Sequence, residues 1–108
     1  MVVKTFEAEG VTVYQVDGEI NISTSPDLKK QFEKQPAKKA VVDLAKVNYI
    51  DSSGLATLVE LLKKTKGQGG NLALAGMSEK VKSLFEITKL DKLFPIFPTH
   101  QEAVTKVK

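Results

Sequence analysis

Hydrophobic and polar residues follow two different periods along the chain. From Val3 to Ala8 and from Val11 to Val16 they alternate loosely, and Glu9-Gly10 lies between the two runs, which predicts a β-hairpin. An apolar run from Ala40 to Leu44 predicts a buried strand. Beyond this run the spacing becomes helical. One face of that predicted helix carries Leu55, Leu58, Val59 and Leu62, and the opposite face, which we expect to be solvated, carries Thr57, Glu60 and Lys64.

Between the hairpin and the buried strand, a first helix is predicted. Glu19 to Ile22 is typical of a strand ending or a bend. Ser23 to Asp27 then combines hydroxyl caps, a proline for the first turn and an acid for the positive end of the helix dipole. Leu28 and Phe32 are expected to face inward, and Pro36 ends the helix.

The last third of the chain predicts two further helices and two strands. Gly67 to Gly70 breaks the chain before a strand at Asn71 to Ala75. Pro95 and Pro98 restrict Phe94 to Phe97 to an edge strand. Thr99, with Glu102 three residues later, forms a capping box for a last helix. The third helix is expected to face inward with Val81, Leu84, Phe85 and Thr88, and the last helix with Ala103, Val104 and Val107.

This order of elements predicts one α/β domain over residues 1–108. The length of 108 residues is enough for one hydrophobic core, and the chain has no repeat or long linker. Right-handed crossovers leave consecutive strands parallel, so we expect a mixed, mostly parallel sheet that opens with the hairpin and carries about four helices. Asn21 and Asp51 both follow strands, and they should share the edge where the carboxyl ends of the strands meet.

The segment Asp51-Ser52-Ser53-Gly54-Leu55 has more polar groups than a helix start needs. Asp and Ser are common N-caps, so the run could be a plain cap. One cap residue is enough, however, and at least one of the two hydroxyls should be spare and exposed. Gly54 disfavours the helix, which points to close approach by another backbone or by a partner. The residues alone leave a plain cap and a functional site as equal alternatives.

Composition excludes several classes of function. The chain has no cysteine, hence no disulfide or thiolate site, and we expect no metal site and no cofactor. All 16 basic residues are lysines, and Lys63, Lys64 and Lys66 fall where they oppose a helix dipole, so we expect no direct contact with nucleic acid. His100 is interpreted as a helix-start residue. No phosphate-binding loop motif supports nucleotide binding. The first residues lack the apolar core of a signal peptide, and no run is long enough to cross a bilayer, so we expect a cytoplasmic protein.

Two motifs and their positions resemble a known family. Asp51-Ser52-Ser53-Gly54-Leu55, preceded some thirty residues earlier by Gly18-Glu19-Ile20-Asn21, is similar to the STAS domain, in particular to its stand-alone bacterial anti-sigma factor antagonists. The resemblance extends over the whole chain, including the opening hairpin and the tail Leu90-Asp91-Lys92-Leu93-Phe94. It implies the STAS fold, with helices packed on one sheet.

The resemblance also implies a function in transcription regulation without catalysis. Antagonists of this family bind an anti-sigma factor, usually a serine kinase, and so release a sigma factor. The kinase inactivates the antagonist by phosphorylating the serine after the motif's aspartate, and a phosphatase reverses this. That serine is Ser52 here, with Asp51 orienting or recognising it, Ser53 as cap or contact, and Gly54 and Leu55 in the surface. We expect a monomer.

Asn21 is a departure from the family pattern, because many relatives have aspartate there. Asparagine lacks the charge on which a kinase contact relies, and it could instead be a turn residue without a partner.

Two functions other than a phosphorylation-switched antagonist were considered. The chain could be a STAS scaffold or regulatory subunit of a stress-signalling particle or a lipid-transport complex, without phosphorylation. A serine hydrolase is disfavoured, because no base is placed beside Ser52.

Overall fold

The computed structural model describes residues 1–108 as a five-stranded sheet with helices on both faces. The strands are β1 (Val2–Ala8), β2 (Val11–Asp17), β3 (Lys39–Lys46), β4 (Asn71–Ala75) and β5 (Ile96–Phe97). The helices are α1 (Ser25–Lys34), α2 (Ser52–Gly67), α3 (Glu79–Ile87), the short 3-10 helix η1 (Leu90–Lys92) and α4 (His100–Val107). None of these helices is long and apolar enough to span a lipid bilayer.

The strands lie in the sheet in the same order as in the sequence, β1 to β5. β1 and β2 form the predicted antiparallel hairpin, with Ala8 opposite Val11. The pairs β2–β3, β3–β4 and β4–β5 are parallel, which confirms the mixed, mostly parallel sheet. β5 has only two residues and forms the edge, as the flanking prolines predicted. Because β2 and β3 are parallel neighbours, their carboxyl ends lie side by side at the same end of the sheet.

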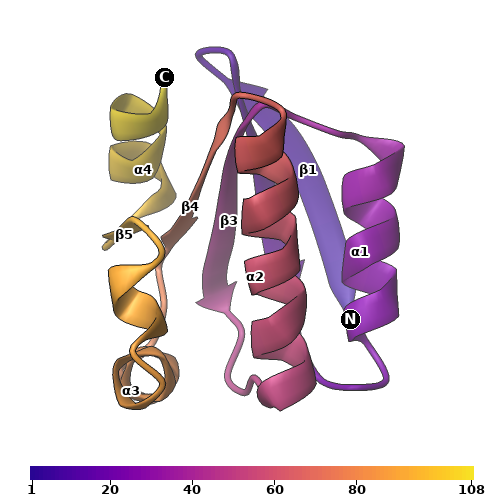
Figure 1. Ribbon diagram of the computed structural model, residues 1–108, viewed down its shortest axis with the longest axis vertical. Helices are drawn as coiled ribbons and strands as arrows, with labels where there is room; N and C mark the ends of the chain where they lie inside the picture. Colours follow the sequence, from indigo (N-terminus) through magenta and orange to yellow (C-terminus); the bar gives the residue numbers. More distant parts are fainter.

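Both faces of the sheet are covered, but unequally. α1, α2 and α3 cover one face over a core cluster of 19 buried residues, which includes Tyr14, Val42 and Leu74. α4 alone covers the other face, over a cluster of eight buried residues that includes Val13 and Val41 (Figure 1). Successive residues of a strand point to opposite faces, so β3 supplies both clusters. This explains why its apolar residues form a continuous run.

The buried face of α2 is wider than the spacing of its leucines predicted. Leu55, Leu58 and Leu62 are buried as expected. Thr57, expected on the solvated face, is also buried, so this prediction is wrong. Thr57 shares a stripe at four-residue intervals with Leu61 and Thr65, which are buried too. Leu61 and Thr65 lie beside Phe32 of α1, because α2 packs against a neighbouring helix as well as against the sheet.

The other helices agree with the sequence except at two positions. Thr88 is exposed rather than inward, because α3 ends at Ile87 and the Thr88 hydroxyl donates to the Leu84 carbonyl oxygen. The Thr24 hydroxyl does not cap α1, although Thr24 is the residue at its N-cap. The inward residues of α1 and of α4 are buried, and the Thr99 hydroxyl caps α4 by accepting from the Glu102 amide. The stack of Phe32 on Tyr14 fixes α1 on β2, and burial raises the pKa of Tyr14 to about 12.

Candidate functional site

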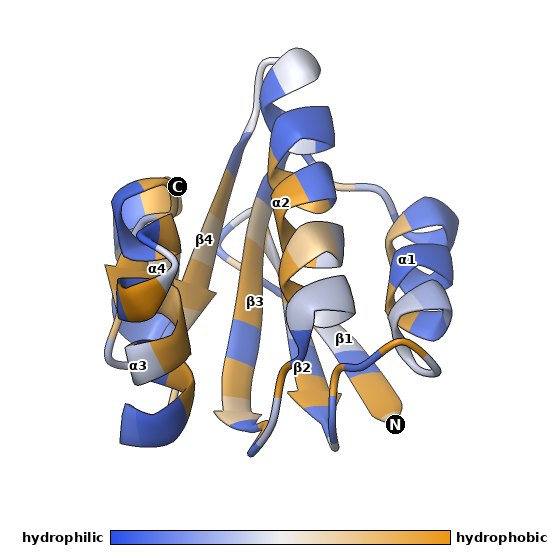
Figure 2. Ribbon diagram, turned by 60° about the horizontal axis from the view of Figure 1, so that its bottom comes forward, coloured by the Kyte–Doolittle hydropathy of each residue, from blue (hydrophilic) through white to orange (hydrophobic).

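Two loops at the carboxyl ends of β2 and β3 join to form one surface. The Ile20 amide donates to the Tyr49 carbonyl oxygen at 3.0 Å, and the Asp51 amide donates to the Ile20 carbonyl oxygen at 3.1 Å. These bonds form an isolated parallel bridge between Ile20 and Ile50, whose side chains are both buried. Figure 2 shows the two loops side by side at the start of α2. The predicted meeting of the segments around Asn21 and Asp51 is therefore confirmed.

Asp51 links the two loops to the first turn of α2. Its Oδ1 accepts from the Gly54 amide at 2.9 Å, which makes it the N-cap of the helix. Its Oδ2 accepts from the Ile22 amide at 3.1 Å, across 29 residues of sequence. Both carboxylate oxygens thus bind backbone amides of this chain. The carboxylate thus has two structural roles: it caps α2, and it also holds the Ile22 loop against the start of that helix.

Asn21 shapes the loop that Asp51 fixes. Its side-chain Oδ1 accepts from the amides of Ser23 and Thr24, at 2.9 and 3.1 Å. The Thr24 hydroxyl accepts from the Asn21 amide and donates to the Glu19 carbonyl oxygen. Asparagine therefore acts here as a turn residue, one of the two alternatives that the sequence left open. An aspartate at this position would accept the same two bonds, so the loop geometry does not require the missing charge.

Gly54 is required by the close approach of the Ile20 backbone. A Cβ atom at this position would lie 2.5 Å from the Ile20 carbonyl oxygen and 2.7 Å from the Ile50 Cγ2 atom. Both distances are shorter than side chains tolerate. Of the two explanations for this glycine, approach by another backbone of the same chain is the one that the structure supports. Gly54 and Leu55 are both buried, so they support the surface from below and are not exposed to a partner.

Ser52 provides the exposed and unengaged group of the site. It is the first residue of α2 and is exposed, whereas Ser53 is half-buried. Neither hydroxyl makes a hydrogen bond within the chain, and the amides of both residues have no acceptor there. Ile22 and Tyr49, from the two loops, are 73% and 42% exposed, although both are large and apolar. The site therefore combines a free hydroxyl, free helix amides and an exposed apolar rim.

A second polar cluster lies on the opposite face of the sheet, and the sequence did not reveal it. Asp43 of β3 is buried, and its Oδ2 lies 3.0 Å from His100 Nδ1 and 3.2 Å from Gln15 Nε2. His100 is the first residue of α4, as predicted, but it also joins that helix to the sheet. The only sequence signal is an acid inside the apolar run of β3. No three histidine, aspartate or glutamate side chains gather as a metal site would require.

Comparison with known proteins extends these observations. Residues 3–103 match the model of the STAS domain family. A relative from Listeria monocytogenes, the anti-sigma-B factor antagonist, is 33% identical over 97 residues, which are 87% of this chain and 84% of that protein.

Solved structures show the same fold. A crystal structure of an anti-sigma factor antagonist from Mycobacterium paratuberculosis superposes with a TM-score of 0.88 at 28% identity, over 98% of this chain and 92% of that one. The Bacillus cell fate determinant SpoIIAA, solved in its phosphorylated form, shares the fold at 14% identity with a TM-score of 0.75, over 99% of this chain and 100% of that one. The chain thus belongs to the STAS domain family and, within it, to the anti-sigma factor antagonists.

Proposed function

We propose that this protein binds an anti-sigma factor through the surface around Ser52, and that phosphorylation of Ser52 switches the binding off. The observation that carries the proposal is the exposed Ser52 hydroxyl, which no group of the chain engages, at the start of α2. Asn21, Asp51 and Ser53 complete the polar part of the surface. The Listeria relative is named as an antagonist of an anti-sigma factor, which supports the same class of partner for this chain.

Phosphate on Ser52 is compatible with the fold. The unpaired amides at the start of α2 and the positive end of its dipole both favour an anion. Because Ser52 is exposed and its hydroxyl makes no hydrogen bond within the chain, the modification disrupts nothing in the core. The folded state therefore tolerates the phosphorylated residue, and the change is confined to the surface.

The same phosphate is expected to repel a docked partner. It adds roughly 1.5 to 2 negative charges next to the Asp51 carboxylate. In the bare protein, the exposed side chains of Ile22 and Tyr49 offer apolar contact on the two loops that meet at the start of α2. A partner that packs on these side chains would bury the phosphate without a compensating cation, which is unfavourable. Binding and phosphorylation thus exclude one another.

The proposal includes the enzymes that operate the switch. The anti-sigma factor itself is the expected serine kinase, and a separate phosphatase restores the hydroxyl. The chain is a regulator and not an enzyme, in line with its family. We propose that it acts in the cytoplasm as a monomer. Asn21 keeps the loop in shape but offers no carboxylate to the kinase, so recognition by the kinase relies on Asp51 and on the apolar rim.

Affinity capture from the organism's own cells tests this function. The bait proteins are the wild type, Ser52→Ala, Ser52→Asp and, as a matched control, Ser83→Asp, which adds the same charge at an exposed serine of α3. Mass spectrometry identifies the captured proteins and the modification of Ser52. We expect a kinase-type anti-sigma factor with the wild type, Ser52→Ala and Ser83→Asp, its loss with Ser52→Asp, and phosphate on Ser52. The same partners on all four baits, with Ser52 unmodified, would instead indicate a scaffold subunit.

A further inference from the structure

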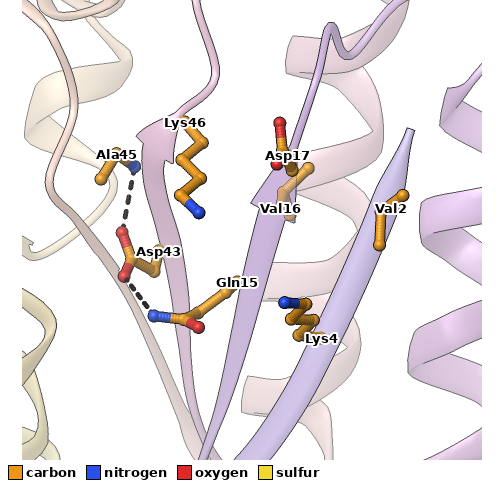
Figure 3. A pocket seen from close by; sticks show the side chains of 8 residues that line it. All are labelled: Val2, Lys4, Gln15, Val16, Asp17, Asp43, Ala45 and Lys46. Carbon is orange, nitrogen blue, oxygen red and sulfur yellow. Dashed lines mark hydrogen bonds between the residues drawn. The ribbon is translucent and has the colours of Figure 1, made fainter.

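α4 covers only part of its face of the sheet, and the uncovered part contains a cavity of about 120 Å³. α4 covers the first residues of the strands, where Val13 and Val41 are fully buried. Two residues further along the same strands, Gln15 and Asp43 line the cavity, and Ala45 beyond them is exposed. Figure 3 shows the cavity across β1, β2 and β3, with no helix over it. This place is on the opposite face of the sheet from α2 and its Ser52.

An irregularity of β3 directs a lysine into this cavity. Gln15 of β2 pairs with Asp43 of β3, but Asp17 pairs with Lys46, so that β3 contains one extra residue between the pairs. Asp43 stabilises the bulge, because its Oδ1 accepts from the Ala45 amide at 3.0 Å. In a regular strand Lys46 would point to the face of the large core. The bulge instead turns it to the cavity, as bulges commonly re-aim side chains near binding sites.

Two ammonium groups therefore face the cavity from opposite sides. Lys4 of β1 lies opposite Gln15 in the hairpin register, and Figure 3 shows its Nζ and that of Lys46 both directed inward. Neither lysine takes part in an ion pair, because the three ion pairs of the chain involve other residues. The lining contains two carboxylates, Asp17 at the exposed rim and the buried Asp43, and neither forms an ion pair with Lys4 or Lys46.

The remaining polar groups of the lining are held in place. Asp43 is buried, and it accepts from Ala45, Gln15 and the His100 ring. It is satisfied, and it requires no cation from a ligand. The bond to Asp43 engages the amide nitrogen of Gln15, which leaves its Oε1 free to accept from a ligand hydroxyl or amine.

We propose that this cavity binds a small anion, a carboxylate or a phosphate, between Lys4 and Lys46. The two ammonium groups donate charge-assisted hydrogen bonds to the anionic group, and the Gln15 Oε1 accepts a hydrogen bond from a donor on the same molecule. The volume of about 120 Å³ suits an anion of a few heavy atoms. The proposal is independent of the function of Ser52. A competing explanation is that the lysines only keep an open sheet face soluble.

Amide NMR titration of the wild-type protein with sodium phosphate and, separately, with sodium succinate tests the proposal. Sodium chloride keeps the ionic strength constant, because screening alone weakens contacts of exposed charges. The variants are Lys4→Gln and Lys46→Gln, and the matched control is Lys63→Gln, which removes an equal charge from the exposed face of α2. Thermal unfolding confirms that all variants are folded.

Saturable shifts at residues 15–17 and 43–46 with at least one probe are the expected result, and the probe that saturates identifies the anion class. The affinity should fall about tenfold in Lys4→Gln and Lys46→Gln and stay unchanged in Lys63→Gln. Shifts that rise linearly without saturation, or an equal loss in all three variants, would overturn the proposal. The same holds if neither probe shifts these residues.

Discussion

Asp51 and Asp43 perform similar structural tasks in two places of very different exposure. Each carboxylate accepts a backbone amide close in sequence, from Gly54 or from Ala45, and each also joins segments far apart in the chain. Asp51 is half-buried at a loop edge, whereas Asp43 is buried on a central strand.

The difference shows how one residue type serves two purposes. At the loops, Asp51 joins two segments and leaves Ser52 exposed, with a hydroxyl that no group of the chain engages. On the sheet, Asp43 fixes a bulge and α4, and it directs Lys46 toward a cavity. In both places the aspartate organises a neighbour that is available for contact. Replacing each aspartate should therefore lower the free energy of unfolding more where the aspartate is more buried. Replacing Ser52 or Lys46 should lower it much less than replacing either aspartate.

The largest effect is expected for Asp43→Ala. The change leaves the Ala45 amide, the Gln15 amide group and the His100 ring without their acceptor, in a place that is only partly open to water. We expect a loss of about 3 kcal/mol in the free energy of unfolding, measured in urea. Asp17→Ala, at the exposed rim of the same face, is the control and should change it by less than about 0.5 kcal/mol. Equal losses would show that Asp43 has no special structural role.

Gly54→Ala should have the next largest effect. Its Cβ would lie 2.5 Å from the Ile20 carbonyl oxygen, so the loop that carries Asn21 must shift. Overpacking of this kind costs about 2 kcal/mol. Gly67→Ala is a matched control at the other end of α2, where a Cβ would meet nothing within 4 Å. It should raise stability by about 0.5 kcal/mol. A neutral Gly54→Ala in urea unfolding would contradict the close packing of the two loops.

Asp51→Ala should cost less than Asp43→Ala, because Asp51 is only half-buried. It removes the cap of α2 and the bond to the Ile22 amide, for an expected loss of about 1.5 kcal/mol. Ser78→Ala removes only a cap, that of α3, and should cost about 1 kcal/mol. Amide exchange of Ile22 provides a direct measurement, since it should become faster in Asp51→Ala and stay unchanged in Ser78→Ala. Unchanged exchange in both variants would argue against the link between the loops.

The smallest effect is expected at Ser52. Ser52→Ala removes a hydroxyl that makes no hydrogen bond, so the free energy of unfolding should change by less than about 0.5 kcal/mol. Ser52→Asp places a negative charge in the first turn of α2 and should raise stability by about 0.5 kcal/mol at low salt. Thermal unfolding at low and high salt measures both. A large loss in either variant would mean that Ser52 supports the fold and is a poor place for a reversible modification.

Local patterns predicted most of the secondary structure and part of the site. The alternation in the hairpin, the helical spacing of Leu55, Leu58 and Leu62, and the capping box at Thr99 depend on neighbours in sequence, and the structure confirms them. Thr57 was misplaced because the burial of one side of a helix depends on a second helix, here α1. Thr88 was misplaced because α3 ends at Ile87, so Thr88 lies just beyond the helix and not on its inner face.

The sequence by itself determined the fold class, the family and the position of Ser52 at a helix start, because short-range spacing and local motifs carry this information. The tertiary structure decided which groups remain free for contact. It assigned both oxygens of Asp51 to backbone amides, placed the Ile20 backbone against Gly54, and joined Asp43 to His100 across 57 residues. It also turned Lys46 through a bulge. Such contacts depend on the register of neighbouring strands and on packing between distant segments, which no local pattern specifies.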